Sequence, residues 1–221
     1  SEMCIRDRDE RIFIEKFIEN PRHIEVQVLS DGNKSLHLYE RECSLQRNNQ
    51  KILEEAPCNF ISDELKEKLY KASLDCVRAT GYLGAGTVEF LVDKDENFYF
   101  CEMNTRLQVE HAVTEMITGI DIIKEQFRIA SGLGLSISKD DVKVSGHAIE
   151  VRINALDPMK DFTPSSGKIN FLFTPGGVDT RFESAIYKGL EIPIYYDSMI
   201  GKIIVKGQRR LSAIKKLRRA I

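Results

Sequence analysis

The sequence lacks the features that mark several broad classes of protein. No apolar run approaches the roughly 18 residues of a membrane-spanning helix, and no signal peptide is visible. The net charge is −2, which gives no general attraction to nucleic acid or to an anionic membrane. The five cysteines include no C-x-x-C pair, so we expect neither a zinc site nor a disulfide framework. These absences predict a cytoplasmic protein without nucleic-acid or membrane partners.

The apolar content is high enough for a packed core. The 221 residues are 42% hydrophobic and 30% charged, which suits one large domain or parts of two. Residues Ser1–Arg8 show no periodicity, and we interpret them as a non-native leader. Leu211–Ile221 begins a helix that has no C-cap signal. We therefore expect the chain to be a fragment.

Alternating apolar residues predict three strands near the start of the chain. They are Arg11–Ile18, His23–Leu29 and Leu36–Glu40, with a hairpin turn at Asp31–Asn33. Cys43–Ala56 is dense in polar groups. We expect that segment to be extended or looped, and not a buried central strand.

Two helices are predicted from periodicity and capping residues. Ser62–Thr80 has a serine that can cap its start and is followed by Gly81, which can end it. Its predicted inward stripe consists of Leu65, Leu69, Ala72, Cys76 and Ala79. A second helix is predicted over Asp121–Gly132, with these residues inward: Ile122, Ile123, Phe127 and Ala130.

Two strands, Thr87–Val92 and Phe98–Asn104, flank a short loop and predict a hairpin. If Asp93 pairs with Phe98, then Glu89 lies directly opposite Glu102. Like charges at that distance require compensation, and Asn104 adds a third oxygen on the same face. The donor set suits magnesium held partly by substrate phosphates. The alternative is neutralisation of the two carboxylates by a lysine or an arginine.

The stretch Cys101–Glu115 is the densest in functional side chains. In extended backbone, alternate residues share a face, so the polar side chains from Glu102 to Glu110 would line one edge. Such an edge suits a metal and a small anion, or else an edge strand with a salt-bridged outer face. His111 is expected to be structural.

The last third of the chain is rich in turns. His147–Asn154 is predicted as a strand with Arg152 in its polar row, and shorter strands are predicted at Lys168–Phe173, Thr180–Glu183 and Lys202–Val205. The basic cluster Lys215–Arg219 is interpreted as a solvated helix face. The glycine-rich Gly81–Gly86 is interpreted as a helix-to-strand connection, because no strand precedes it and no Gly-Lys-Ser/Thr follows it.

Several ordered motifs resemble those of biotin carboxylases. They include E-K-F-I-E-N-P-R-H-I-E-V-Q, E-C-S-L-Q-R-N-N-Q-K, E-M-N-T-R-L-Q-V-E-H, E-V-R-I-N-A and Y-Y-D-S-M-I-G-K. The resemblance implies an α+β ATP-grasp fold, with an antiparallel sheet and flanking helices, followed by part of a biotin carboxylase C-terminal domain. After the non-native leader at 1–8, it implies the ATP-grasp portion at 9–145 and the truncated C-terminal domain at 146–221.

The resemblance also implies a reaction and a set of site residues. The family makes carboxybiotin from ATP, bicarbonate and biotin, with Mg²⁺ or Mn²⁺. Glu110 would deprotonate bicarbonate, Arg106 would act with it, and Arg152 would bind biotin and stabilise its enolate. Bicarbonate would be held by Lys51, Arg106, Gln108 and Val109, and the metals by Glu89, Glu102 and Asn104. ATP would contact Glu15, Lys16, Phe17, Ile18, His23, Gln46, Asn49, Glu89, Leu91 and Glu102.

The sequence departs from the family pattern at some positions. Asn49 replaces a usual histidine, and Val178 replaces a dimer-contact aromatic residue while Arg181 remains. The last motif is most similar to the subunit that serves acetyl-CoA carboxylase in fatty acid synthesis. That reading implies a biotin carboxyl carrier protein, carboxyltransferase subunits and a homodimer. The alternatives are propionyl-, methylcrotonyl- or pyruvate carboxylase, a ligase like carbamoyl-phosphate synthetase, or a nonenzymatic binding domain.

Overall fold

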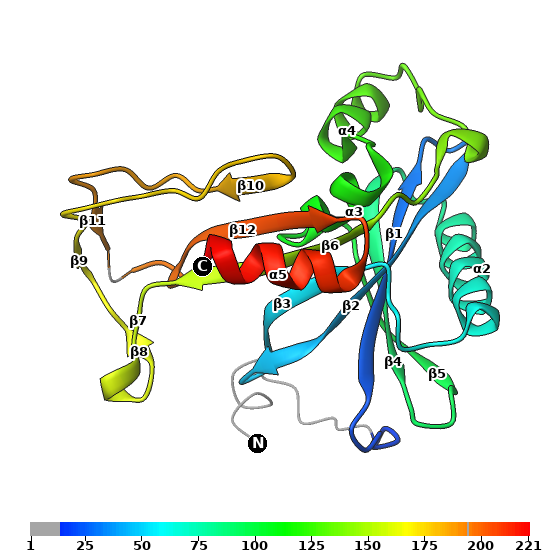
Figure 1. Cartoon of the computed structure of the whole chain (residues 1–221). Coiled ribbons are helices and arrows are strands. Elements are labelled where there is room, and N and C mark those ends of the chain that lie inside the picture. Colours follow the sequence, from blue (N-terminus) through cyan, green and yellow to red (C-terminus); the bar gives the residue numbers. More distant parts are fainter. Residues whose placement is uncertain (1–13, 194) are drawn as a thin grey trace, which may run out of the picture.

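The alternating segments of the chain form one large antiparallel sheet (Figure 1). The structure is a computed structural model that describes residues 14–193 and 195–221. The eight strands are hydrogen-bonded in the order β10-β12-β6-β3-β2-β1-β4-β5. Their bounds are β1 Arg22–Ser30, β2 Ser35–Arg47, β3 Gln50–Ala56, β4 Gly84–Val92, β5 Phe98–Asn104, β6 His147–Asn154, β10 Thr180–Glu183 and β12 Met199–Gly207.

Four helices and several short elements complete the described fold. The helices are α2 Asp63–Thr80, α3 His111–Thr118, α4 Ile122–Ala130 and α5 Arg210–Ala220, with single 3₁₀ turns at Lys139–Asp141 and Pro158–Lys160. The short strands are β7 Leu156–Asp157, β8 Thr163–Pro164, β9 Gly167–Lys168 and β11 Glu191–Ile192. None of the helices in the described part of the chain combines the length and the apolar character that a membrane crossing needs.

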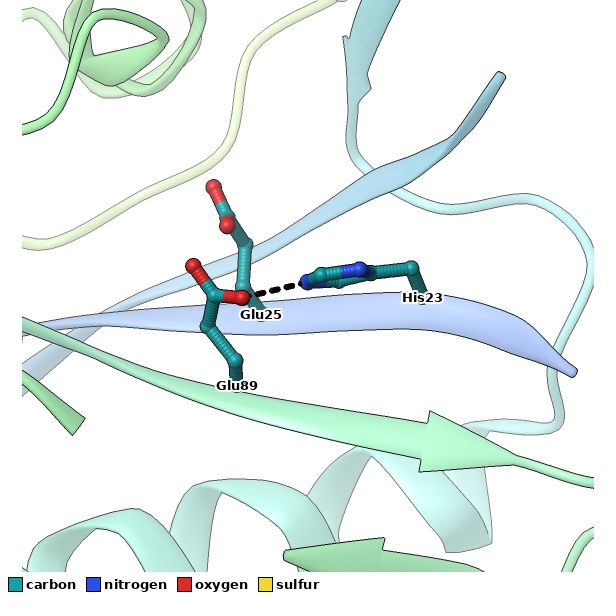
Figure 2. A group of neighbouring side chains, drawn as sticks. All are labelled: His23, Glu25 and Glu89. Carbon is teal, nitrogen blue, oxygen red and sulfur yellow. Dashed lines mark hydrogen bonds and ion pairs between the residues drawn. The ribbon is translucent and has the colours of Figure 1, made fainter. Parts of the chain in front are cut away.

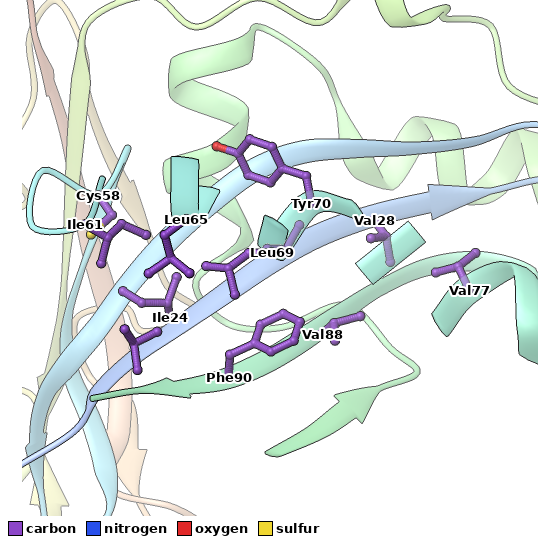
Figure 3. Close-up of a cluster of buried hydrophobic side chains, with 12 residues drawn as sticks. Ile24, Val28, Cys58, Ile61, Leu65, Leu69, Tyr70, Val77, Val88 and Phe90 are labelled. Carbon is purple, nitrogen blue, oxygen red and sulfur yellow. The ribbon is translucent and has the colours of Figure 1, made fainter. Parts of the chain in front are cut away.

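The two faces of the sheet have different coverings. Helix α2 packs on the face formed by Ile24, Val26 and Val28 of β1, together with residues of β4 (Figure 3). On the same face, α5 covers apolar residues of β6 and β12. Helices α3 and α4 lie against the opposite face, where they join separate apolar clusters. Because successive side chains of a strand point to opposite faces, the polar residues that alternate with these apolar ones point towards the side of α3.

Most predicted elements are present. The strands predicted at His23–Leu29 and Thr87–Val92 lie within β1 and β4, and those at His147–Asn154 and Thr180–Glu183 match β6 and β10. Helix α2 starts after Ser62, whose hydroxyl accepts a hydrogen bond from the Leu65 amide, and ends at Gly81 in the left-handed conformation. The caps that the sequence offered are therefore the caps that the structure uses.

Two predictions about strands near the start were wrong. Residues 14–18, the described part of the segment predicted at Arg11–Ile18, are not in a strand, and Ile14 and Phe17 are exposed. No strand in the described residues pairs with them to complete a ladder. The segment Cys43–Ala56 was not expected to form a buried central strand, yet β3 lies between β2 and β6. Its glutamates are buried because distant cations pair with them.

Predictions of inward faces were less accurate than predictions of elements. In α2, Ala79 is exposed and Ala72 and Cys76 are only half-buried, while the buried residues are Leu65, Leu69, Tyr70, Ser73 and Val77. In α4, Ile123, Phe127 and Ala130 are exposed. The helix buries Ile122, as predicted, and also Glu125, whose carboxylate accepts hydrogen bonds from Ser136.

The prediction of a strand over Lys168–Phe173 was also largely wrong. Only Lys168 of that range is in a strand, as the second residue of the two-residue β9. Ile169 extends the pairing by exchanging backbone hydrogen bonds with Leu190 and Gly189. Phe171 and Phe173 are exposed, so no buried face supports a longer strand there.

Candidate active site

A cavity of about 770 Å³ lies over the polar face of the sheet. It collects side chains from strands β1 to β7 and β12, and from connections between them, which are far apart in the sequence. The hairpin between β2 and β3, the end of β5 and the connection to α3 all border it. Predicted site residues that line this cavity are His23, Gln46, Asn49, Lys51, Glu89, Glu102, Asn104, Arg106, Gln108, Val109, Glu110 and Arg152.

Two carboxylates face each other at one side of this cavity. Glu89 of β4 pairs directly with Glu102 of β5, as the sequence predicted. Asn104 lies on the same face and its Nδ2 donates to both carboxylates, at 3.0 Å in each case. Glu102 is largely exposed, whereas Glu89 is buried. One carboxylate of the pair is thus held by the protein and the other is open to a ligand.

A β-bulge aligns this carboxylate pair. The sequence argument paired Asp93 with Phe98, whereas the structure pairs Val92 with Phe98. The register then shifts, and Cys101 is the β5 residue without a cross-strand partner. The starting pair in the sequence argument was wrong by one residue. The extra residue of the bulge, Cys101 on β5, compensates for that error. Glu89 and Glu102 are therefore still opposite each other.

Glu89 is the most heavily hydrogen-bonded of these carboxylates. His23 Nε2 lies 2.6 Å from its Oε2, and Gln108 Nε2 donates to its Oε1 at 2.7 Å. Figure 2 shows the His23 ring directed at Glu89, with Glu25 beside it. Although burial alone would raise it, the His23 hydrogen bond and the Lys51 charge lower the pKa of Glu89 to about 2. Glu89 is therefore an anion at neutral pH.

Lys51 joins three carboxylates. Its Nζ donates to Glu25 at 2.6 Å, to Glu110 at 2.7 Å and to Glu89 at 3.0 Å. An ammonium has three N–H donors, so all of them are engaged. Burial acts to lower the pKa of Lys51, but the charges of Glu25 and Glu110 raise it above its usual value. The ammonium is the fixed cation at the centre of the site.

The donor chemistry separates two possible cation positions. Ligand atoms of His23, Glu25 and Glu89 lie within 4.8 Å of one another, but the Lys51 ammonium already serves two of these carboxylates. Among the described residues, Glu102 has no ion pair with lysine or arginine. Glu102 Oε2, which accepts no hydrogen bond from the described residues, and the Glu89 oxygens are the hard ligands that magnesium prefers. The residues therefore fit a magnesium ion on the Glu89–Glu102 side.

Glu110 lies between two cations at the start of α3. Lys51 contacts one of its oxygens, and Arg152 of β6 donates to the other at 3.1 Å. Both oxygens of Glu110 therefore accept hydrogen bonds from cationic side chains. Arg152 Nε also donates to Glu54 at 2.8 Å. Burial raises the pKa of Glu54 to about 7, despite the opposing charge of Arg152.

The remaining predicted residues border the same space. Arg106 is exposed at the edge, where its guanidinium contacts only the Leu107 carbonyl among the described residues. The Val109 carbonyl accepts a hydrogen bond from Lys202 of β12. Gln46 donates to a ring nitrogen of His23 at 3.0 Å. The strand alternation that starts at Glu102 ends at Asn104, where β5 ends and the chain turns. Helix α3 then begins at His111, and the sequence argument did not predict this helix.

Comparison with known proteins decides the family. The family described as carbamoyl-phosphate synthase L chain, ATP binding domain, matches residues 5–138, and the biotin carboxylase C-terminal domain matches residues 150–221. The biotin carboxylase of Nostoc sp. is 52% identical over 211 residues, which are 95% of this chain and 47% of that protein. The chain belongs to the biotin carboxylase family. It spans about half the length of the curated relatives it matches.

Solved structures of other biotin carboxylases have the same fold. Biotin carboxylase of Campylobacter jejuni, in a complex with βγ-ATP, has a TM-score of 0.94 and 47% identity, covering 99% of this chain and 49% of that one. The biotin carboxylase domain of Hydrogenobacter thermophilus 2-oxoglutarate carboxylase, a dimer with MgADP, ADP and bicarbonate, has a TM-score of 0.90 and 50% identity. It covers 93% of this chain and 46% of that one. The predicted ATP-grasp fold is confirmed.

Five residues predicted to contact ATP do not line the cavity. Glu15, Lys16, Phe17 and Ile18 belong to the unpaired segment before β1, where Lys16 Nζ donates to the Tyr99 hydroxyl at 2.7 Å. Leu91 lies on β4 away from the cavity lining. Their predicted contacts with ATP remain predictions.

Sequence reasoning missed the buried polar residues beneath the cavity. Glu25 and Gln27 of β1, Arg41 of β2, and Glu150 of β6 are all fully buried. The available signal was the alternation of Glu25 and Gln27 with Ile24, Val26 and Val28. That pattern was interpreted as an apolar face alone, although both faces of β1 are covered.

Proposed function

We propose that the chain is part of an enzyme that carboxylates biotin with bicarbonate and ATP, through carboxyphosphate. The observation that carries this proposal is the meeting of Lys51, Glu110 and Arg152 beside the opposed carboxylates Glu89 and Glu102. One carboxylate flanked by two cations, next to a metal-binding pair, suits deprotonation of an oxyanion and transfer of a phosphoryl group. Membership in the biotin carboxylase family supports the same reaction.

Glu110 is proposed as the general base. Its carboxylate takes the proton of bicarbonate, and the resulting oxygen attacks the γ-phosphorus of ATP, releasing ADP and giving carboxyphosphate. Lys51, Arg106, Gln108 and the Val109 backbone hold the anion in place. Because all three Lys51 donors are engaged, one of its carboxylate contacts must be exchanged when bicarbonate arrives.

Glu89, Glu102 and Asn104 are proposed to hold magnesium, or manganese, with ATP. The Asn104 amide has its nitrogen towards both carboxylates, and a rotation of the amide would present its oxygen to a cation. A bound ion would neutralise phosphate charge. His23, Gln46 and Asn49 lie on the side of the pocket where the nucleotide is proposed to bind.

Arg152 is proposed to act in the second half of the reaction. Its guanidinium already bridges Glu54 and Glu110, so it is fixed in direction before any substrate binds. A planar guanidinium can donate two hydrogen bonds to the enolate oxygen of biotin, which has two lone pairs to accept them. Carboxyphosphate splits into carbon dioxide and phosphate, the phosphate takes the proton of the biotin N–H, and the deprotonated nitrogen bonds to the carbon dioxide.

We further propose that the enzyme serves acetyl-CoA carboxylase, with a biotin carboxyl carrier protein and carboxyltransferase subunits as partners and a homodimer as its assembly. The Y-Y-D-S-M-I-G-K motif supports that choice. Pyruvate, propionyl-CoA and methylcrotonyl-CoA carboxylases are the alternatives, and 2-oxoglutarate carboxylase is also among the similar proteins. The division into 9–145 and 146–221 stays part of this proposal.

The test is ATP hydrolysis by the full-length protein that carries this chain. We expect hydrolysis only when bicarbonate and free biotin are both present. Glu110→Gln should lower the rate by about 10²–10⁴-fold, the usual contribution of a general base. Arg152→Ala should abolish carboxybiotin formation, and Lys215→Ala, at an exposed position of α5, is the matched control. Turnover that depends on ammonia and ignores biotin would overturn the proposal in favour of a carbamoyl-phosphate synthetase-like ligase.

A further inference from the structure

Arg41 is buried beneath the cavity and does not line it. The side chain is fully buried on β2, and it is absent from the residues that border the pocket. A guanidinium has five N–H donors in a rigid plane. A fully buried cation is costly unless its donors are satisfied, so the contacts of Arg41 show what it holds in place.

All five donors of Arg41 are accounted for. Nε donates to Glu25 at 2.5 Å, and the terminal nitrogens donate to Gln27, Thr114, Thr87 and Gln108 at 2.7, 3.0, 3.2 and 3.0 Å. These partners come from β1, β4, α3 and the connection before α3. Arg41 therefore ties the floor of the sheet to the loop that carries the proposed bicarbonate ligands.

The contact with Gln108 fixes the direction of an amide. Arginine can only donate, so the Gln108 atom that faces Arg41 must be the oxygen. The amide nitrogen then points the other way, where one of its hydrogens reaches Glu89 at 2.7 Å. The second hydrogen is left for the pocket. The hydrogen bond to Glu89 favours the same orientation of the amide. Glu89 is also a proposed metal ligand, however, whereas Arg41 has no proposed contact with a metal or a substrate.

We propose that Arg41 is a positioning residue that fixes the Gln108 amide so that it presents an N–H, and not its oxygen, to bicarbonate. This inference rests on the proposed function. Arg41 does not contact the substrate, but under this proposal it is one of the residues that determine how bicarbonate binds. An amide oxygen in the same place would repel the anion. The orientation of the Gln108 amide therefore decides whether this residue favours or opposes the binding of bicarbonate.

The first test is Arg41→Lys in the full-length protein. The lysine keeps the ion pair with Glu25, and hence the position of Lys51, but it loses the planar fork that reaches Gln108. We expect KM for bicarbonate to rise about tenfold, the value of one charge-assisted hydrogen bond. KM for ATP should stay within about twofold, since such a change is below one hydrogen bond. Arg22→Lys, with a half-exposed arginine paired to Glu42, is the matched control.

A double-mutant cycle separates positioning from a general structural effect. If Arg41 acts through Gln108, then Arg41→Lys combined with Gln108→Ala should have the bicarbonate KM of Gln108→Ala alone, within about twofold. Additive effects, or an equal rise in KM for ATP, would overturn the proposal. A crystal structure of full-length Arg41→Lys gives a second readout, in which the Gln108 amide should have turned. An unchanged amide would also overturn it, whereas loss of bicarbonate dependence in the unmutated protein would overturn the proposed function instead.

Discussion

Neighbouring residues of β1 point into two different kinds of protein interior. Ile24, Val26 and Val28 are fully buried against α2, in a cluster of apolar side chains (Figure 3). Glu25 and Gln27 are equally buried on the other face, where each is hydrogen-bonded to Arg41. The apolar face gains free energy from any close packing. The polar face is favourable only when each donor meets an acceptor, so it specifies geometry more than it adds stability.

The largest effect should follow from breaking the polar face. Glu25→Ala leaves the charges of Arg41 and Lys51 without their shared partner, because Glu25 contacts both. We expect the free energy of unfolding to fall by about 4 kcal/mol, as for other broken buried ion pairs. Urea denaturation at neutral pH measures it. Glu19→Ala, at an exposed glutamate, is the control, and a loss no larger than that of the control would contradict the comparison.

The adjacent residue tests the apolar face. Ile24→Ala removes a fully buried side chain from the cluster under α2. The expected loss is about 3 kcal/mol from lost burial and the cavity left behind. Because no charge is involved, the loss should be the same between about pH 5 and pH 8. A pH-dependent loss, measured by urea denaturation across that range, would show that the two faces are not independent.

The polar face should also give stability a pH dependence. Burial raises the pKa of Glu54 to about 7, despite the opposing charge of Arg152. In the window between its usual value and about 7, the folded protein keeps a proton that the unfolded chain has lost. The free energy of unfolding should therefore fall by about 2 kcal/mol as the pH rises from about 5 to 7.

Glu54→Gln isolates this contribution. Glutamine keeps an acceptor for Arg152 but cannot ionise. At each pH, the free energy of unfolding of the variant is subtracted from that of the unmutated chain. If all other groups, Glu150 included, are unaffected by the substitution, their pH dependence cancels in this difference. The difference should decline with rising pH. A difference that is constant from about pH 5 to pH 7 would mean that Glu54 titrates normally.

The smallest effect is expected at a helix end on the apolar side. Ser62 caps α2, and its hydroxyl also contacts Glu96. Ser62→Ala should cost about 1 kcal/mol in the free energy of unfolding, the usual value of a lost N-cap. Thermal and urea unfolding both measure it. Ser62→Asp, which restores a capping oxygen but lies near Glu96, should recover part of the loss; if it recovers none, the cap is not the cause.

Local patterns could be read from the sequence, but ion pairs between distant residues could not. β6 was predicted because its apolar residues alternate, and α2 because its caps are adjacent to its apolar stripe. The same kind of reasoning placed Glu89 opposite Glu102. β3 was missed because Glu54 and Glu55 suggested a surface. Their partners Arg152 and Arg210 lie 98 and 155 residues away in the sequence.

The cavity residues illustrate the same limit. The hairpin argument and the family resemblance supplied the predicted site residues that line it, whereas Arg41 carries no motif and shows its importance only through five contacts in space. In α4, a stripe of Ile123 and Phe127 looked like an inward face. The hydrogen bonds of Glu125 to Ser136 oriented the helix differently, and no periodicity in the sequence contains that information.

The pairing of β3 with β6 has a mechanical consequence. Four successive residue pairs, from Leu53 with Val151 to Ala56 with Ala148, join the strand that carries Lys51 to the strand that carries Arg152. These strands cannot separate without breaking the ladder in the middle of the sheet. The floor of the pocket is therefore stiff, and the two cations keep a constant spacing. Access to the pocket is therefore through its open side, and not between strands that slide apart beneath it.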